Sequence, residues 1–279
     1  MIDFVTTVFS YGFMRNALMA GILVSIACGV IGTLVVLNRI VFLSGGIAHA
    51  AYGGVGLAFY LGIDPVIGAV VFSLLSALGM GLVQRKTRQR ADTLIGAMWA
   101  VGMALGIIFI NLSPGYKADL MSYLFGSILA VSQLDIWLML TVVGLVIVLV
   151  VMFYKGWLAI SFDETFARVR NLPVDALYLL MIAMIGLTVV IAMRVVGLIM
   201  IIALLTIPPA IANLFLKSMW KIMVLASALS VIFTVAGLVI SYTLNLTSGA
   251  TIILVAGTAY LVAYLVRMLC RPCRAQVTV

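Results

Sequence analysis

Long runs of apolar residues, separated by short polar connections, dominate the chain. A helix needs roughly 20 apolar residues to cross about 30 Å of hydrocarbon. Nine such runs are found, at residues 17–37, 41–61, 65–83, 93–112, 136–154, 176–193, 195–215, 219–244 and 249–268. The pattern predicts an all-α, polytopic transmembrane helix bundle. Because Pro208 and Pro209 interrupt the seventh run, eight complete spans with one broken helix are an alternative.

Composition supports a membrane protein and excludes a soluble globular domain. Of the 279 residues, 66% are hydrophobic and only 9% are charged, whereas a soluble surface needs far more polar side chains. We expect residues 1–279 to form a single transmembrane domain surrounded by lipid. The net charge of +8 resides in short loops between apolar runs, so we expect no nucleic-acid partner.

The loop charges predict how the chain is oriented. If the N-terminus lies outside and nine spans alternate, the outer loops hold only three basic residues, namely Arg15, Lys117 and Arg194. The inner loops hold most of the others. Since cytoplasmic loops of membrane proteins are enriched in Lys and Arg, this asymmetry predicts an N-out, C-in topology.

Acidic and phosphate-binding motifs are missing from the spans. Every Asp and Glu falls at a span end or in a loop, where Asp92 and Asp175 are well placed as helix N-caps. Proton- or sodium-coupled carriers usually bury a carboxylate in the membrane. The sequence also lacks a G-x-x-x-x-G-K phosphate loop. We therefore expect a transport pathway without a catalytic residue, and not an enzyme.

His49 is the single histidine and lies inside the second run. At helical spacing it shares a stripe with Gly45 and Gly53, next to a second stripe with Gly46 and Gly54. Small residues every four positions let another helix approach closely, so helix packing or a pathway lining explains the glycines. The imidazole is either a structural group bonded to a neighbouring helix or a ligand in a translocation path.

The longest inner connection, SFDETFARVRNLPV at 161–174, predicts a short amphipathic helix over about 161–172. Ser161 and Glu164 match a capping box, and Pro173 ends the helix. Its apolar face holds Phe162, Phe166 and Val169. Its charged residues include Asp163, Glu164 and Arg170.

Four blocks give the chain a family resemblance. They are the histidine-bearing segment 36–58, SYLFGSILAVSQLD at 122–135, the segment 161–174, and VVGLIMIIALLTIPPAIANL at 195–214. In this order they resemble the permease subunits of bacterial ABC importers for zinc, manganese and iron. The resemblance covers most of the chain.

The resemblance implies a permease of the bacterial cytoplasmic membrane whose substrate is a divalent metal ion. It implies a homodimer, two cytosolic ATPase subunits that consume the ATP, and an extracytoplasmic substrate-binding protein, with no cofactor bound by this chain. The segment 161–172 would be the coupling helix that contacts the ATPase. The contact residues would be Phe162, Asp163, Glu164, Phe166, Val169 and Arg170.

One position departs from the family pattern. The family usually has G-D-A-x-S-H here, with an aspartate four residues before the histidine, and this chain has Gly45 instead. Only the histidine carries over, so His49 would be a transient metal contact. Because manganese favours carboxylates and zinc accepts imidazole, the change favours zinc, with manganese or iron possible.

Two other functions compete with this one. A self-contained channel or secondary carrier would use a broken helix such as the one at Pro208 and Pro209. A non-transporting anchor subunit of a membrane enzyme complex would need cofactor ligands, and one histidine cannot make a two-histidine haem site within one chain. Co-purification with an ATPase separates the permease from both.

Overall fold

The computed structural model describes residues 11–86, 91–113, 126, 128 and 131–269, and nine of its helices are long and apolar enough to cross a membrane. These helices are α2 (Gly12–Leu37), α3 (Val41–Leu61), α4 (Pro65–Lys86), α5 (Ala91–Leu112), α7 (Gln133–Phe162), α9 (Val174–Val196), α10 (Leu198–Phe215), α11 (Met219–Leu244) and α12 (Ser248–Leu269). A short helix, α8 (Glu164–Val169), connects α7 to α9. The predicted all-α bundle is confirmed for the described residues, with nine candidate spans.

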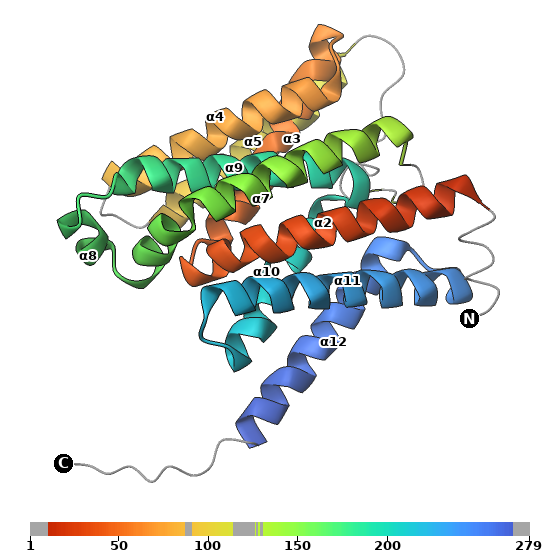
Figure 1. Cartoon of the computed structure of the whole chain (residues 1–279). Coiled ribbons are helices and arrows are strands. Elements are labelled where there is room, and N and C mark those ends of the chain that lie inside the picture. The colour runs from red at the N-terminus through yellow and green to blue at the C-terminus, as the bar shows by residue number, and fades with distance from the viewer. Residues whose placement is uncertain (1–10, 87–90, 114–125, 127, 129–130, 270–279) are drawn as a thin grey trace.

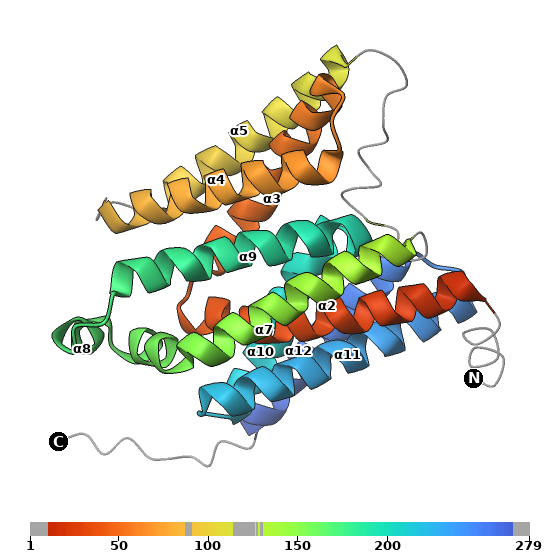
Figure 2. The ribbon, with the colours of Figure 1, turned by 45° about the horizontal axis from the view of Figure 1, so that its top comes forward.

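The helices form two groups joined by a central one (Figures 1 and 2). Helices α3, α4 and α5 pack together on one side, and α2, α10, α11 and α12 pack together on the other. Helix α9 contacts α3 and α4 in the first group and α2 and α10 in the second. The core of the molecule therefore runs through α9.

Helix α10 continues through both prolines, contrary to the expectation of a break there. Pro209 lacks the N–H that would bond the carbonyl of Leu205, which would disfavour a helix in an apolar environment. Gly32 of α2 packs directly against that carbonyl, so closely that any Cβ at Gly32 would collide with it. The helical conformation is interrupted instead at Gly197, which has a φ of 81°. Helix α9 ends before this residue and α10 begins after it.

The α3–α5 group is held together by close backbone contact. Gly54 of α3 faces Gly68 of α4, and a Cβ on either residue would collide with the backbone of the other helix. On the α5 side, a Cβ at Gly53 would lie 2.9 Å from the carbonyl oxygen of Gly102. Since lipid offers no hydrophobic drive for helix association, this fit of small residues stabilises the group through dispersion contacts.

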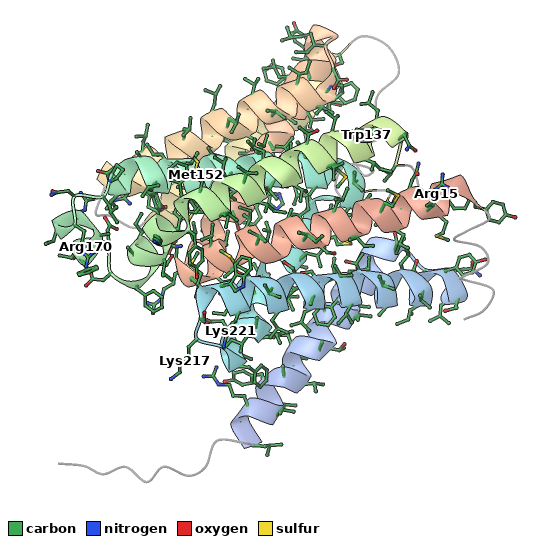
Figure 3. All side chains as sticks on the ribbon, in the orientation of Figure 1. Arg15, Trp137, Met152, Arg170, Lys217 and Lys221 are labelled. Atoms are coloured by element: carbon green, nitrogen blue, oxygen red, sulfur yellow. The ribbon has the colours of Figure 1, made fainter. Side chains whose placement is uncertain are left out.

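Basic side chains mark the two ends of the bundle. Figure 3 shows Arg170, Lys217 and Lys221 toward the end that carries α8, and Arg15 at the opposite end. This is the separation that the loop charges predict, and the cytoplasmic assignment of the α8 end stays a prediction.

We expect cysteines introduced at Lys86 and Gln133 to react with an impermeant thiol reagent from opposite sides of the membrane. Lys86 ends α4 and Gln133 begins α7, and the N-out topology places Lys86 inside and Gln133 outside. Labelling in intact and permeabilised cells, with the native cysteines replaced, measures this. Labelling of both positions from one side would contradict the topology.

Candidate functional site

His49 lies half-buried in α3 and contacts two side chains of α5. Its ring stacks on the indole of Trp99, with ring centroids 4.0 Å apart and planes inclined by 18°. Its Nδ1 lies 3.1 Å from the sulfur of Met103. In the tautomer with the proton on Nδ1, the imidazole donates to this thioether and keeps the Nε2 lone pair free for a ligand. Sequence reasoning did not identify Trp99 or Met103.

The glycine stripes of α3 have two different environments. Gly46 packs against Ile95 of α5, and Gly53 and Gly54 pack against α5 and α4, so a Cβ at any of these three would be crowded. At Gly45, one turn before His49, a Cβ would meet only Trp99 Cζ3, at an ordinary 3.8 Å. The position that holds an aspartate in the family pattern therefore has room for a Cβ.

The described residues do not form a complete metal site. Among the residues that the structure describes, no group of three or more His, Cys, Asp or Glu side chains is placed to hold a metal ion. His49 supplies one imidazole, and the Met103 thioether beside it is a soft, weak donor. Such a donor set suits brief contact with a passing ion better than tight binding.

Helix α8 (Glu164–Val169) begins later and ends earlier than the predicted 161–172, with Arg170 and not Pro173 following its last residue. Asp163 is its N-cap, with a carboxylate that accepts from the backbone N–H groups of Thr165 (2.8 Å) and Phe166 (3.1 Å). The predicted cap at Ser161 is wrong because α7 continues to Phe162. The Ser161 hydroxyl instead accepts a hydrogen bond from Asn38 Nδ2 at 2.9 Å.

The predicted apolar contact residues are exposed. Phe162 at the end of α7 is 72% exposed, and Phe166 and Val169 of α8 are 52% and 76% exposed. The Arg170 guanidinium lies 5.2 Å from the centre of the Phe166 ring. Ala167 faces the opposite way and is fully buried in the core, which fixes the helix to the bundle.

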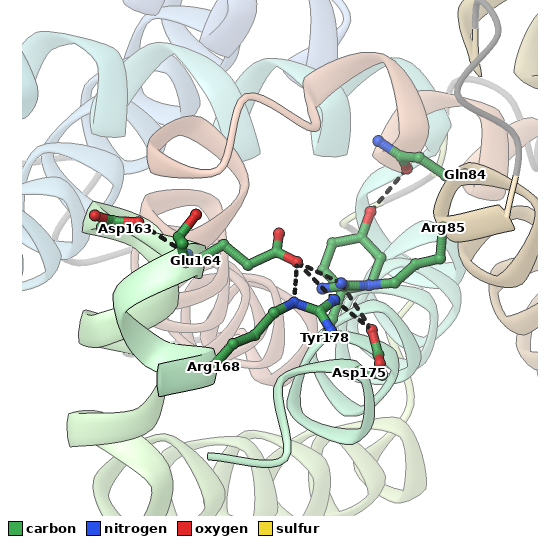
Figure 4. Close-up of polar contacts among 8 residues, drawn as sticks. Gln84, Arg85, Asp163, Glu164, Arg168, Asp175 and Tyr178 are labelled. Atoms are coloured by element: carbon green, nitrogen blue, oxygen red, sulfur yellow. Dashed lines mark hydrogen bonds and ion pairs between the residues drawn. The ribbon is translucent and has the colours of Figure 1, made fainter. Parts of the chain in front are cut away.

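An ion-pair cluster connects α8 to two other helices (Figure 4). Arg85 Nη1 of α4 lies 2.7 Å from Glu164 Oε1 of α8 and 2.8 Å from Asp175 Oδ1 of α9. Arg168 Nη2 of α8 lies 2.9 Å and 3.2 Å from the same two oxygens. The sequence predicts Asp175 as the N-cap of α9, and this is wrong because Pro173 holds that position.

The cluster keeps Glu164 ionised. Partial burial raises the pKa of Glu164, but hydrogen bonds and charges from Arg168 and Arg85 outweigh it and hold the pKa below its usual value. These ion pairs are therefore formed at neutral pH and are lost only as pH falls through the lowered pKa. Beside them lies a cavity of about 790 Å³, whose lining includes Asn38, Arg39, Arg85 and Glu164.

Comparison with known proteins identifies the family. Residues 10–267 match the ABC 3 transport family. The chain is 56% identical over 263 residues to an uncharacterized membrane protein of Synechocystis, covering 94% of both. It is 37% identical over 262 residues to the manganese transport system membrane protein MntC of Listeria innocua, covering 94% of this chain and 93% of the relative.

A solved structure shares the fold. PsaBC from Streptococcus pneumoniae in complex with Fab superposes with a TM-score of 0.86 at 35% identity, covering 95% of each chain. The chain belongs to the ABC 3 transport family. It is a multi-pass permease of a metal ABC transporter in the bacterial cytoplasmic membrane. Family membership supports the permease over the self-contained carrier and the anchor subunit.

Gly45 and Gly54 of α3 give a matched test of helix packing. We expect Gly54→Ala to lower the unfolding temperature of the purified protein, because the new methyl group collides with α4 and overpacking costs about 1–3 kcal/mol. Gly45→Ala should leave it unchanged or raise it, since the methyl group fits and alanine favours a helix. Equal unfolding temperatures for the two variants would contradict this packing.

Proposed function

We propose that the chain is the membrane-spanning subunit of an ATP-driven importer of a divalent metal ion. Two copies form the permease core, two cytosolic ATPase subunits bind α8, and an extracytoplasmic binding protein delivers the metal. Family membership and the exposed apolar residues at Phe162, Phe166 and Val169 support this assembly. The relative named as a manganese transport system membrane protein supports a metal as the substrate.

The observation that carries the pathway assignment is the environment of His49. A polar side chain within a membrane span is costly and is therefore a candidate functional group. The stack on Trp99 and the contact with Met103 hold the imidazole in one orientation, and the Nδ1-protonated tautomer would present Nε2 to a passing ion. In this proposal the metal touches His49 only briefly, because a tightly held ion would not leave.

Zinc is the substrate that the donor chemistry favours. Manganese prefers carboxylate and carbonyl oxygens, whereas imidazole suits zinc and other later transition metals. Gly45 offers no carboxylate, and the neighbours of the imidazole are a thioether and an indole. Two His49 imidazoles from a dimer would suit zinc. Manganese is the second candidate, because a relative that is 37% identical carries that name.

Metal selectivity tests the proposal directly. We expect the complex, reconstituted with its ATPase and binding protein, to transport zinc faster than manganese or iron. Gly45→Asp should raise the manganese-to-zinc ratio several-fold, because it restores an oxygen ligand at a position where a Cβ makes only an ordinary contact. Gly45→Asn, of the same size and without the charge, is the control and should shift the ratio much less.

His49→Gln should assemble normally and lose at least tenfold in metal-stimulated ATPase activity and uptake. A purely structural histidine would give the opposite result, with lowered stability and unchanged selectivity. If His49→Gln transports every tested metal at the original rate, His49 is not a ligand.

The contact with the ATPase is tested at Phe166. We expect Phe166→Glu to prevent co-purification of the ATPase, because it places a charge among the exposed apolar residues while the membrane fold stays intact. Thr165→Glu adds the same charge to the neighbouring exposed position and should have a smaller effect. A complex that forms normally with Phe166→Glu would refute the contact between α8 and the ATPase.

Native mass measurement of the wild-type complex should find two permease copies. A complex that holds one permease copy would refute the proposed homodimer.

A further inference from the structure

Three helix ends meet at Arg85. This residue lies in the last turn of α4, while Glu164 and Asp175 lie in the first turns of α8 and α9. A cation at a helix C-terminus and carboxylates at helix N-termini are each favoured by the helix dipoles. One guanidinium nitrogen, Arg85 Nη1, contacts both carboxylates, so a single side chain joins three helices.

The position of Arg85 is more constrained than that of a surface ion pair. Only 15% of its side chain is exposed, compared with 51% for Arg168. Its guanidinium lies 4.3 Å from the centre of the Tyr178 ring, and the Tyr178 hydroxyl donates to Gln84 Oε1 at 2.7 Å. Exposed pairs contribute little because water screens them and both side chains lose entropy. Stacking on Tyr178 and partial burial of Arg85 reduce the screening of its ion pairs and the entropy that its side chain loses.

Arg168 provides a natural comparison within the cluster. It contacts the same two carboxylate oxygens but belongs to α8 itself. The ion pairs of Arg168 therefore lie within α8 and between α8 and α9. The ion pairs of Arg85 join both α8 and α9 to α4. Helix α8 also packs against α7 and α9, and it reaches α4 through the Arg85 guanidinium.

Helix α4 is in turn closely packed against the helix that carries His49. The backbones of α4 and α3 approach so closely at Gly68 and Gly54 that a Cβ on either residue would collide with the other helix. Helix α5, which holds the His49 ring through Trp99 and Met103, packs against α3 with equally close contacts. Figure 2 shows α3, α4 and α5 lying together as one group. We therefore expect a displacement of the Lys86 end of α4 to move α3, α5 and His49 together.

We propose that Arg85 is a positioning residue that transmits the movement of α8 to the α3–α5 group and so couples ATP hydrolysis to metal movement. The inference rests on the proposed ATPase contact of α8. Arg85 itself touches neither metal nor nucleotide in this mechanism. Its function is to make α4 follow α8 when the ATPase moves that helix.

The test uses the complete complex in proteoliposomes and measures metal ions transported per ATP hydrolysed. The ion is zinc or manganese, whichever the wild type transports faster. We expect Arg85→Gln to retain the bound ATPase and its ATP hydrolysis while the transport ratio falls at least tenfold. Arg168→Gln, which removes the same charge from the same cluster, should lower the ratio less than threefold. A wild-type ratio for Arg85→Gln, or equal losses in both variants, would overturn the proposal.

A double-mutant cycle with Glu164→Gln completes the experiment. This variant removes the α8 partner of Arg85 and also the pair between Glu164 and Arg168. Its loss in transport ratio should combine with that of Arg85→Gln to less than the product of the two, because the two changes share the Arg85–Glu164 pair. Multiplicative losses in the double variant would overturn the proposal. If Arg85→Gln does not fold, Glu164→Gln alone decides, and a wild-type ratio in that variant is again a refutation.

A refutation of the role of Arg85 can be told apart from a failure of the proposed function. If Phe166→Glu leaves the ATPase bound and transport intact, α8 is not the contact, and the assembly proposal fails. If Phe166→Glu releases the ATPase while Arg85→Gln keeps the wild-type ratio, α8 is the contact and only the role of Arg85 is refuted.

Discussion

Hydrocarbon offers the polypeptide backbone no hydrogen-bond partners, and the architecture of this permease depends on that constraint. Each span must satisfy its own N–H and C=O groups as a helix, which leaves side-chain shape to decide how helices associate. The close approaches at Gly54 and Gly68, and at Gly32 beside the carbonyl of Leu205, show both effects. Glycine lets two backbones touch in one case, and in the other it lets a neighbouring helix pack against a carbonyl to which Pro209 cannot donate.

The same constraint explains where polar side chains are found. Within the bundle several of them are hydrogen-bonded, such as the Ser25 and Thr234 hydroxyls at 2.9 Å and the Ser73 hydroxyl donating to the carbonyl of Gly186 at 3.2 Å, whereas the buried hydroxyls of Thr188 and Ser230 have no partner among the described residues. Such hydrogen bonds lower the cost of placing hydroxyl groups in the membrane. His49 differs because its neighbours are an indole and a thioether, a weak acceptor. This weak partnership leaves the imidazole available for another ligand.

Charge is concentrated where the helices leave the membrane, and this separates two tasks along the length of the bundle. At the α8 end, ion pairs among Arg85, Glu164, Arg168 and Asp175 join three helices. In the proposed mechanism His49 contacts the substrate in a region with few polar groups, and α4 and α3 connect it to these ion pairs. The proposed assembly needs such a connection, because its ATP is hydrolysed by another polypeptide.

The sequence by itself determined the class of fold and the spans, and it identified His49 and the segment after α7 as candidates for function. Apolar run length and loop charge are local properties, and each span must be apolar regardless of its neighbours. Local signals were weaker at helix ends. Ser161 and Glu164 matched a capping box, but Asp163 is the cap because α7 continues to Phe162. The two prolines suggested a break, but α10 is continuous there, with Gly32 of α2 packed against the Leu205 carbonyl.

Tertiary structure alone decided which residues complete the two functional regions. Arg85 and Glu164 are 79 positions apart, and His49 and Met103 are 54 apart, so no periodicity within one helix links them. Their contacts depend on which faces of α3, α4, α5 and α8 meet, and that depends on the fit of small residues between helices. The sequence could therefore identify His49 and the amphipathic segment 161–172. The fold supplied Trp99 and Met103, which contact His49, and Arg85, which we propose connects α8 to the α3–α5 group.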